Sequence, residues 1–353
     1  MSALSKTIGR ARYAAAQGAR VAWYLGQYLL ARRLSGPFNR PGEPKFKPRA
    51  PEGDANRIRQ SFLELFAADR ANIEAGLYPA PDELRVEQAL SALRNSARFF
   101  SDLPHVDARR LQRAGAEVRE AEAPGDGRYP SYYLQNFHYQ TGGWLTEDSA
   151  RLYDTQVEIL FGGAADAMRR IALGSLARAL KGRDQRQVRF LDLGCGNGRF
   201  LSQILAAFPR LPAVGLDLSP AYCAEARTRL APWPRTEIVT GAVEKAPFED
   251  ASFDAATCVF LFHELPPRVR RDTAREIARL LKPGGVFVLA DSVQPGDAVD
   301  LDRMLEYFPV GFHEPFFNSY LSEDFAALFA EAGLALEQTE LAFLTKVMRF
   351  RKA

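Results

Sequence analysis

Apolar and polar positions follow two different patterns, which divide the chain near residue 128. In the second part, short apolar runs of the kind that form buried strands alternate with stretches of helical apolar spacing. The expected strands cover 188–193, 213–217, 255–262, 334–343 and 345–350, the last two as an antiparallel hairpin, and a turn at 280–285 leads into a further strand. This alternation predicts an α/β fold.

The first part of the chain has helical spacing and an uneven charge. Residues 1–35 are expected to form a basic amphipathic helix, because residues 1–42 contain seven lysines and arginines and no acidic residue. Residues 36–54 hold five prolines and predict an extended linker. Residues 55–127 form a predicted helical N-terminal region, and residues 128–353 form the predicted α/β domain.

Two interpretations fit the basic N-terminal helix. It lies on an anionic membrane with its aromatic and leucine side chains buried, or it docks on the body with its arginines in water. A mitochondrial-type presequence shares this composition. The longest charge-free apolar stretch, 21–31, is too short to span a bilayer and lacks a convincing signal-peptide cleavage site. We therefore expect a cytoplasmic protein, with peripheral membrane contact through residues 1–35 as one alternative.

Composition narrows the classes of partner. The chain is 47% hydrophobic and 25% charged, as ordinary globular proteins are, and its net charge of +3 is too small to indicate nucleic acid. Its three cysteines form no C-x-x-C pair, so we expect neither a disulfide framework nor a metal site. An oligomer and a monomer both fit this composition.

The most informative segment is the glycine-rich turn after the first strand. Asp192 ends the apolar run, and Gly194, Gly196 and Gly198 follow at every second position. Glycines there allow a tight turn and the close approach of a ligand to the backbone. Asp217 ends the next strand, 23 positions after Gly194, where a carboxylate can accept hydrogen bonds from ribose hydroxyls. The phosphate-binding spacing G-x-G-x-x-G is absent, so a ribose-bearing ligand without pyrophosphate is predicted.

These motifs resemble, in order, those of the class I S-adenosyl-L-methionine (SAM)-dependent methyltransferases, especially the ubiquinone and menaquinone methyltransferases. The matching stretches are 192–198, 216–219, 241–248 and 280–288. The resemblance implies a doubly wound, Rossmann-like, seven-stranded sheet with an antiparallel C-terminal hairpin, preceded here by the helical N-terminal region. It also implies SAM as the cofactor.

The resemblance further implies which residues surround SAM. The expected cofactor-binding residues are Asp192, Gly194, Cys195, Gly196, Gly198, Asp217, Leu218, Ala242, Val243, Phe260 and Tyr139. Ala242 stands where the family usually has an aspartate that binds the adenine amino group. We therefore expect the backbone of Ala242 and Val243, or a side chain from elsewhere, to recognise adenine.

Two histidines are candidates for chemistry, although methyl transfer needs no universal catalytic residue. His263 follows the expected strand at 255–262. It lies at the edge that faces ligands in doubly wound sheets and could act as a base or orient the acceptor. Its alternative role is to cap the next helix. His138, in an aromatic segment at 129–144, is the second candidate base.

The acceptor pocket is expected to come from that aromatic segment and from an irregular insertion at 293–320. The candidate pocket residues are Tyr133, His313, Glu314, Phe316 and Phe317. Aromatic loops of this kind suit an apolar acceptor, and the aromatic segment could close over SAM. Ordinary packing of aromatic side chains against the sheet is the alternative.

Several functions compete. The first is SAM-dependent methylation of a small lipophilic acceptor, such as a quinone, phenol, fatty acyl group or isoprenoid-like molecule. Alternatives are an O-methyltransferase of a soluble phenolic metabolite with a histidine base, and a non-catalytic SAM-binding scaffold. A nucleic-acid methyltransferase is disfavoured for two reasons. Methylation of a base amino group usually shows an Asn/Asp-Pro-Pro-aromatic turn, but residues 262–265 read Phe-His-Glu-Leu. Methylation of cytosine C5 needs a nucleophilic cysteine after a strand, but Cys258 is predicted to lie inside one.

Overall fold

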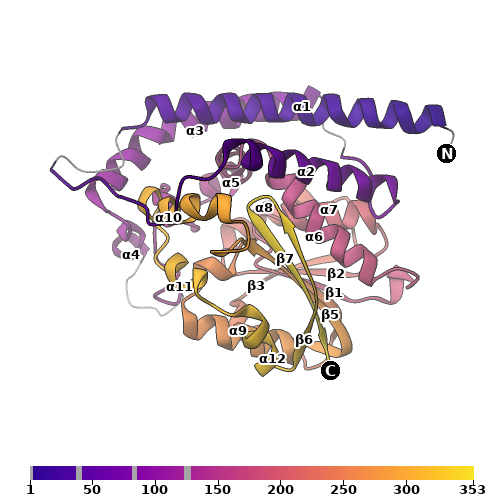
Figure 1. Cartoon of the computed structure of the whole chain (residues 1–353). Helices are drawn as coiled ribbons and strands as arrows, with labels where there is room; N and C mark the ends of the chain where they lie inside the picture. The colour runs from indigo at the N-terminus through magenta and orange to yellow at the C-terminus, as the bar shows by residue number, and fades with distance from the viewer. Residues whose placement is uncertain (1–2, 37–41, 82–85, 123–128) are drawn as a thin grey trace.

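The computed structural model describes residues 3–36, 42–81, 86–122 and 129–353. Within these ranges an α/β body lies beneath a group of long N-terminal helices (Figure 1). Part of the predicted linker, at 37–41, and the end of the predicted helical N-terminal region, at 123–127, lie outside the described residues.

The N-terminal part is helical, as its apolar spacing predicts. The helices are α1 (Ala3–Leu34), α2 (Ala55–Glu74), α3 (Val86–Gln112) and α4 (Glu117–Glu122). Asp54 begins α2 as an N-cap whose carboxylate accepts the amide hydrogen of Asn56. None of the described helices combines the length and apolar character that crossing a bilayer requires.

The sheet has seven strands in the order β3-β2-β1-β4-β5-β7-β6. The strands are β1 (Phe190–Leu193), β2 (Ala213–Asp217), β3 (Thr236–Thr240), β4 (Phe253–Val259), β5 (Leu281–Ser292), β6 (Leu334–Ala342) and β7 (Thr345–Lys352). The first five are parallel, whereas β7 runs antiparallel to both β5 and β6. The predicted doubly wound sheet with an antiparallel C-terminal hairpin is confirmed.

Helices cover both faces of the sheet and bury its alternating apolar residues. They are α5 (Glu147–Leu160), α6 (Ala165–Ala179), α7 (Arg199–Ala207), α8 (Pro220–Leu230), α9 (Pro267–Leu280) and α12 (Phe325–Glu331). One core joins α9 and α12 to one face of the sheet, and a second joins α6, α7 and α8 to the other. Because β1 to β5 are parallel, their carboxyl ends meet at one edge, where ligands of such sheets bind.

Two local predictions were wrong. The fourth strand ends at Val259 instead of 262, because Phe260 has a left-handed backbone (φ 55°), and residues 262–264 form a short 3₁₀ turn. The insertion predicted to be irregular is largely helical, with α10 (Asp302–Gly311) and α11 (Phe317–Leu321). Pro309 suggests a break, but it lies in the last turn of α10, so the hydrogen bond that it cannot donate and any kink affect only the end of the helix.

Candidate functional site

A narrow cleft lies at the carboxyl edge of β1, β2 and β4, around the glycine-rich turn. Its lining residues are Tyr133, Trp144, Tyr153, Arg169, Asp192, Gly194, Cys195, Gly196, Asn197, Arg199, Phe200, Asp217, Tyr222, Val259, Phe260, Leu261 and Glu264. Gly194 and Gly196 have positive φ angles of 68° and 55°. A Cβ on Gly194 would lie 2.8 Å from the Leu261 side chain, so only glycine fits this turn.

Asp217 is fixed beside the glycine turn by the backbone. One carboxylate oxygen accepts the amide hydrogen of Gly196 and the other accepts that of Ser219, both at 2.9 Å. Burial raises the pKa of Asp217, and these amides act in the opposite direction. The carboxylate also lines the cleft, which leaves its remaining lone pairs available to a ligand.

Asp192 is buried at the end of β1. Its carboxylate accepts a hydrogen bond from the Thr257 hydroxyl at 2.7 Å. Burial raises the pKa of Asp192 to about 7, although the Thr257 hydrogen bond opposes this shift. Asp192 can therefore exchange a proton near neutral pH and respond to a charge placed in the cleft.

The aromatic segment predicted at 129–144 forms one wall of this cleft. The indole nitrogen of Trp144 donates to Glu264 at 2.9 Å, and its carbonyl accepts a 2.6 Å hydrogen bond from Ser219. The Trp144 ring packs edge-on against Tyr153 and Tyr222. Burial, more than any neighbouring charge, raises the pKa of Glu264 well above its usual range. The wall is thus joined to the second and fourth strands by polar contacts.

His263 is held by a carboxylate at the end of β5. Its Nδ1 lies 2.6 Å from Asp291, and its backbone amide donates to the other oxygen of the same side chain. Burial alone would lower the pKa of His263, but the charge and hydrogen bond of Asp291 outweigh it and raise the pKa to about 10. Nε2 lies 3.9 Å from Glu264, which lines the cleft. The ring is therefore an imidazolium near neutral pH.

His138 and Glu314 form a second close pair, which joins the aromatic segment to the insertion. Their Nε2 and Oε1 atoms are 2.7 Å apart, and the Glu314 side chain is fully buried. The backbone at His138 and Tyr139 has positive φ angles of 55° and 57°. Such conformations cost about 1–3 kcal/mol each for ordinary residues and are often found at functional sites. The His138 ring contacts Trp144 edge-on, so the pair is one side chain away from the cleft.

Five residues predicted to bind the cofactor do not line this cleft: Gly198, Leu218, Ala242, Val243 and Tyr139. A Cβ on Gly198 would meet Leu230 and Ala226, so this glycine allows α7 and α8 to pack closely. Val243 is buried in the core.

Of the predicted acceptor-pocket residues, only Tyr133 lines the cleft. The Tyr139 ring packs against that of His313, which lies 2.9 Å from the Gln135 amide, and burial lowers the pKa of His313. Phe316 packs against the aromatic cluster around Trp144, and Phe317 packs edge-on against His263.

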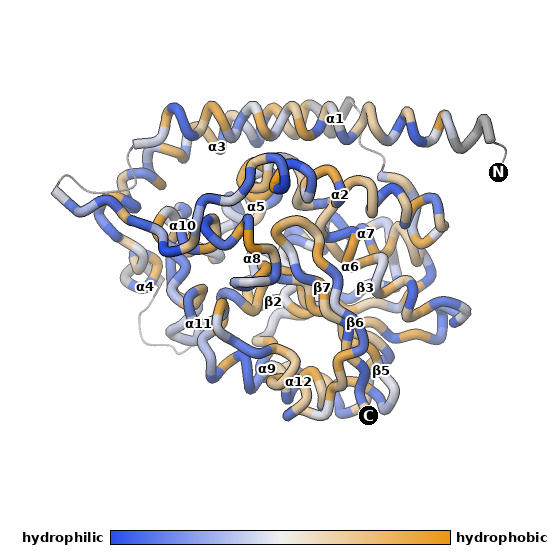
Figure 2. Tube along the Cα trace, viewed as in Figure 1, coloured by the Kyte–Doolittle hydropathy of each residue, from blue (hydrophilic) through white to orange (hydrophobic). Residues whose placement is uncertain are grey.

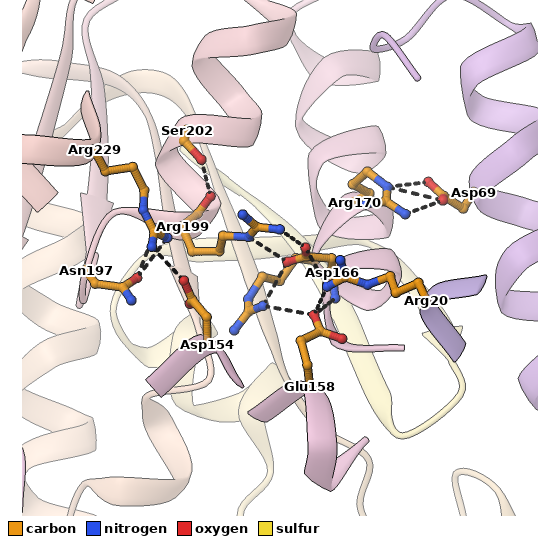
Figure 3. A network of polar contacts seen from close by, with 11 residues as sticks. Arg20, Asp69, Asp154, Glu158, Asp166, Arg170, Asn197, Arg199, Ser202 and Arg229 are labelled. Atoms are coloured by element: carbon orange, nitrogen blue, oxygen red, sulfur yellow. Dashed lines mark hydrogen bonds and ion pairs between the residues drawn. The ribbon is translucent and has the colours of Figure 1, made fainter. Parts of the chain in front are cut away.

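Arg169 and Arg199 line the cleft but were missed by the sequence reasoning. Arg169 lies 3.0 Å from Asp166, which also pairs with Arg199 and with Arg20 of α1 (Figure 3). Arginine charges overcome the effect of burial and hold the pKa of Asp166 well below its usual range. The available signal in the sequence was Arg169 and Arg170 within the mostly apolar stretch 164–177, because charged side chains in a buried helix need partners.

Two arginines of this ion-pair network, Arg169 and Arg199, line the cleft, whereas its carboxylates do not. Its four arginines, Arg20, Arg169, Arg199 and Arg229, face three carboxylates, Asp154, Glu158 and Asp166. Burial raises the pKa of Glu158, which weakens the negative side further. A ligand carboxylate in the cleft would therefore find an arginine partner.

The free space between the cleft side chains is about 90 Å³. Sites for molecules of nucleoside size usually hold about 300 Å³ or more, so binding requires aromatic side chains of the wall to move. A larger hollow of about 320 Å³ lies at the opposite edge of the sheet, around Arg189 and Arg235. It contains no glycine turn and no carboxyl strand end, and we do not assign the site there.

Comparison with known proteins agrees with this geometry. Residues 190–285 match a family model described as a methyltransferase domain. The chain is 31% identical over 167 residues to a demethylmenaquinone methyltransferase of Chlorobaculum tepidum, covering 46% of this chain and 64% of that protein. It is 33% identical over 126 residues to a fatty-acid O-methyltransferase of Mycolicibacterium smegmatis, covering 35% and 43%.

A solved SAM-dependent methyltransferase from Aquifex aeolicus is 16% identical, covering 52% of this chain and 89% of that one, with a TM-score of 0.39. The chain spans less than two thirds of the length of the first curated relatives it matches. Residues 190–285 thus constitute a methyltransferase domain, and the predicted resemblance to the class I SAM-dependent methyltransferases is confirmed.

Proposed function

We propose that this protein transfers a methyl group from SAM to a small lipophilic acceptor. The observation that carries the proposal is Asp217, whose carboxylate is fixed by two amides beside the glycine turn and lines the cleft. This arrangement suits the two hydroxyls of a ribose. The bound cofactor would supply an electrophilic methyl carbon, and the protein would orient the acceptor and exclude water.

The cleft residues fit such a cofactor. Among the described residues, the nearest atom to a Cβ built on Gly196 belongs to Tyr222, at 3.8 Å, so the backbone there is open to close approach by a ligand. Asp217 would hold the ribose, and Arg169 would face the carboxylate of the methionine part. Trp144 and Tyr153 also line the cleft and would place aromatic rings near the cationic sulfur.

We propose Glu244 as the side chain that replaces the missing aspartate at Ala242. It lies two residues further on, and its Oε1 accepts a 2.7 Å hydrogen bond from the Tyr132 hydroxyl. Its Oε2 is buried without a hydrogen-bond partner in the described part of the chain. An amino group such as that of adenine would satisfy this oxygen.

The acceptor is proposed to be a neutral, lipophilic molecule with hydrogen-bond donors. Two similar proteins are named for demethylmenaquinone and for fatty acids, which supports the lipophilic class. Glu264 lines the cleft, and two further buried carboxylates lie outside its lining, Asp291 in contact with His263 and Glu314 in contact with His138. The Glu264 carboxyl group can form hydrogen bonds with the hydroxyls of a reduced quinone or phenol.

His263 is proposed to orient the acceptor as an imidazolium. We expect kcat to stay nearly constant between about pH 7 and 9 and to fall as the pH rises through 10, where the ring loses its proton. Asp291→Asn should lower the pKa of the ring, because it removes the carboxylate that favours the charged form. The pH–rate profile of this variant should therefore decline at lower pH. A wild-type rate that rises about tenfold per unit from pH 7 to 9 would instead identify a neutral histidine base, as the phenolic O-methyltransferase alternative requires.

The whole proposal is tested by transfer of a labelled methyl group from SAM to lipid extracts and to hydroxylated naphthalene and benzene rings. We expect label in a neutral, extractable product, and no label when Asp217 is replaced by alanine. Bound SAM without transfer to any acceptor would favour the scaffold alternative.

We further propose that residues 128–353 form the catalytic domain, that residues 1–35 contact a membrane peripherally, and that the protein acts in the cytoplasm.

A further inference from the structure

Helix α1 has its polar residues on the inside. Tyr13, Gln17 and Gln27 are buried against the body, and the Tyr13 hydroxyl donates to Asp69 at 2.5 Å. Arg20 also points inward and lies 2.6 Å from Glu158 and 2.9 Å from Asp166 (Figure 3). A helix on the surface of a water-soluble protein normally buries its apolar face instead.

The outward face of α1 is correspondingly apolar. Between residues 14 and 30, the exposed positions are Ala14, Ala15, Gly18, Ala19, Ala22, Trp23, Leu25, Gly26, Leu29 and Leu30. None of them carries a charge or a hydrogen-bonding group except the indole nitrogen of Trp23, and Leu29 is 56% exposed. At 1.5 Å per residue, this face is about 25 Å long. It is a continuous apolar surface, not a set of scattered side chains.

Contacts with the body fix this orientation of the helix. The Arg20 ion pairs set its rotation, and the chain at Gly163 packs directly against it. A Cβ on Gly163 would lie 3.1 Å from the Cα of Val21. Turning the apolar face inward would break a buried ion pair, which is strongly unfavourable. The apolar face therefore needs a cover from outside the chain.

The charges at the ends of the face indicate what covers it. Arg12 is exposed before it, beside Arg10, which is paired with Glu74 of α2, and Arg32 and Arg33 are exposed after it. A second copy of α1, packed parallel or antiparallel, would bring arginines against arginines at both ends. An anionic bilayer would instead accept the apolar face among its acyl chains and the arginines among its headgroups.

Helix α3, beside α1, also exposes apolar and basic side chains. It contacts α1 and lies with it along the outer side of the molecule (Figures 1 and 2). Leu90 and Leu93 are more than half exposed on α3, and Arg94 and Arg98 are exposed beside them. We infer that the outward face of α1, flanked by α3, is an interfacial anchor that binds anionic membranes. This inference rests on the peripheral membrane contact proposed above and names its surface and lipid class, and its test needs neither methyl transfer nor a cofactor.

The test is co-sedimentation of the full chain with vesicles made of equal parts phosphatidylglycerol and phosphatidylcholine, or of phosphatidylcholine alone. We expect binding to the anionic vesicles that is at least ~30-fold tighter than to the neutral ones and that weakens at high salt. Replacing Leu25, Leu29 and Leu30 together with serine should weaken binding to the anionic vesicles at least ~30-fold.

Leu336→Ser combined with Leu341→Ser provides the control. These leucines are exposed on β6 to a similar degree, 41% and 46%, and their replacement should leave vesicle binding unchanged. Far-UV circular dichroism checks that both variants fold. Equal binding to both kinds of vesicle, retained binding by the α1 variant, or no binding by the wild type would overturn the inference. A different outcome would assign the face to a second copy of the chain: the wild type sediments as a dimer and does not bind vesicles, and the α1 substitutions dissociate the dimer.

Discussion

Replacing Asp217 with alanine is expected to weaken SAM binding by at least ~100-fold. Its carboxylate would accept two hydrogen bonds from the ribose, and each bond to a charged group is worth about 1.5–3 kcal/mol. The same carboxylate holds the amides of Gly196 and Ser219, so its removal also loosens the glycine turn against which the cofactor lies. Isothermal titration calorimetry with SAM measures the loss directly.

Two variants separate recognition from folding. Asp217→Asn keeps an acceptor of similar size, and its binding should lie between those of the wild type and the alanine variant. Asp184→Ala is the control. The Asp184 carboxylate also accepts a hydrogen bond from a backbone amide, that of Arg186, but it lies outside the cleft. This variant should bind SAM like the wild type. Unchanged SAM affinity in a folded Asp217→Ala protein would contradict the proposed cofactor site.

The parts of the fold that could be predicted are those specified by local sequence. The glycine turn needs backbone angles that glycine adopts readily, and Asp217 ends a short apolar strand, so both could be recognised without tertiary information. Alternating apolar residues also predicted the C-terminal hairpin. The helix at 302–311 was missed because Pro309 and the nearby phenylalanines resemble an irregular loop, whereas packing against the sheet favours a helix.

The polar pairs of the site could not be predicted in the same way, because their partners are distant in sequence. His263 was a candidate base from its position alone, but its protonation is set by Asp291, 28 residues away on another strand. Glu314 meets His138 only because the insertion folds back on the aromatic segment. Charges buried by tertiary packing leave almost no local pattern, and their pKa values depend on that packing.

Replacing Arg169 with glutamine is expected to weaken binding of S-adenosylhomocysteine by about 30-fold or more. The side chain is buried at 3.0 Å from Asp166 and, like that of Arg199, it lines the cleft. Truncating one partner of a buried, hydrogen-bonded charge pair commonly costs about 2–5 kcal/mol of binding free energy. Methylthioadenosine has the same nucleoside but no amino-acid part, so its affinity should remain within about twofold of the wild-type value.

This contrast between two ligands distinguishes carboxylate recognition from damage to the fold. A distorted cleft would weaken both ligands together, whereas loss of a carboxylate partner weakens only S-adenosylhomocysteine. Arg170→Gln is the matched control, because Arg170 is the next residue of the same helix, is equally buried and pairs with Asp69 away from the cleft. It should lower the melting temperature without changing the ratio of the two affinities. If Arg169→Gln also leaves that ratio unchanged, Arg169 serves only the ion network, and the methionine carboxylate must be held by another group, of which Arg199 is the nearest cationic candidate in the cleft.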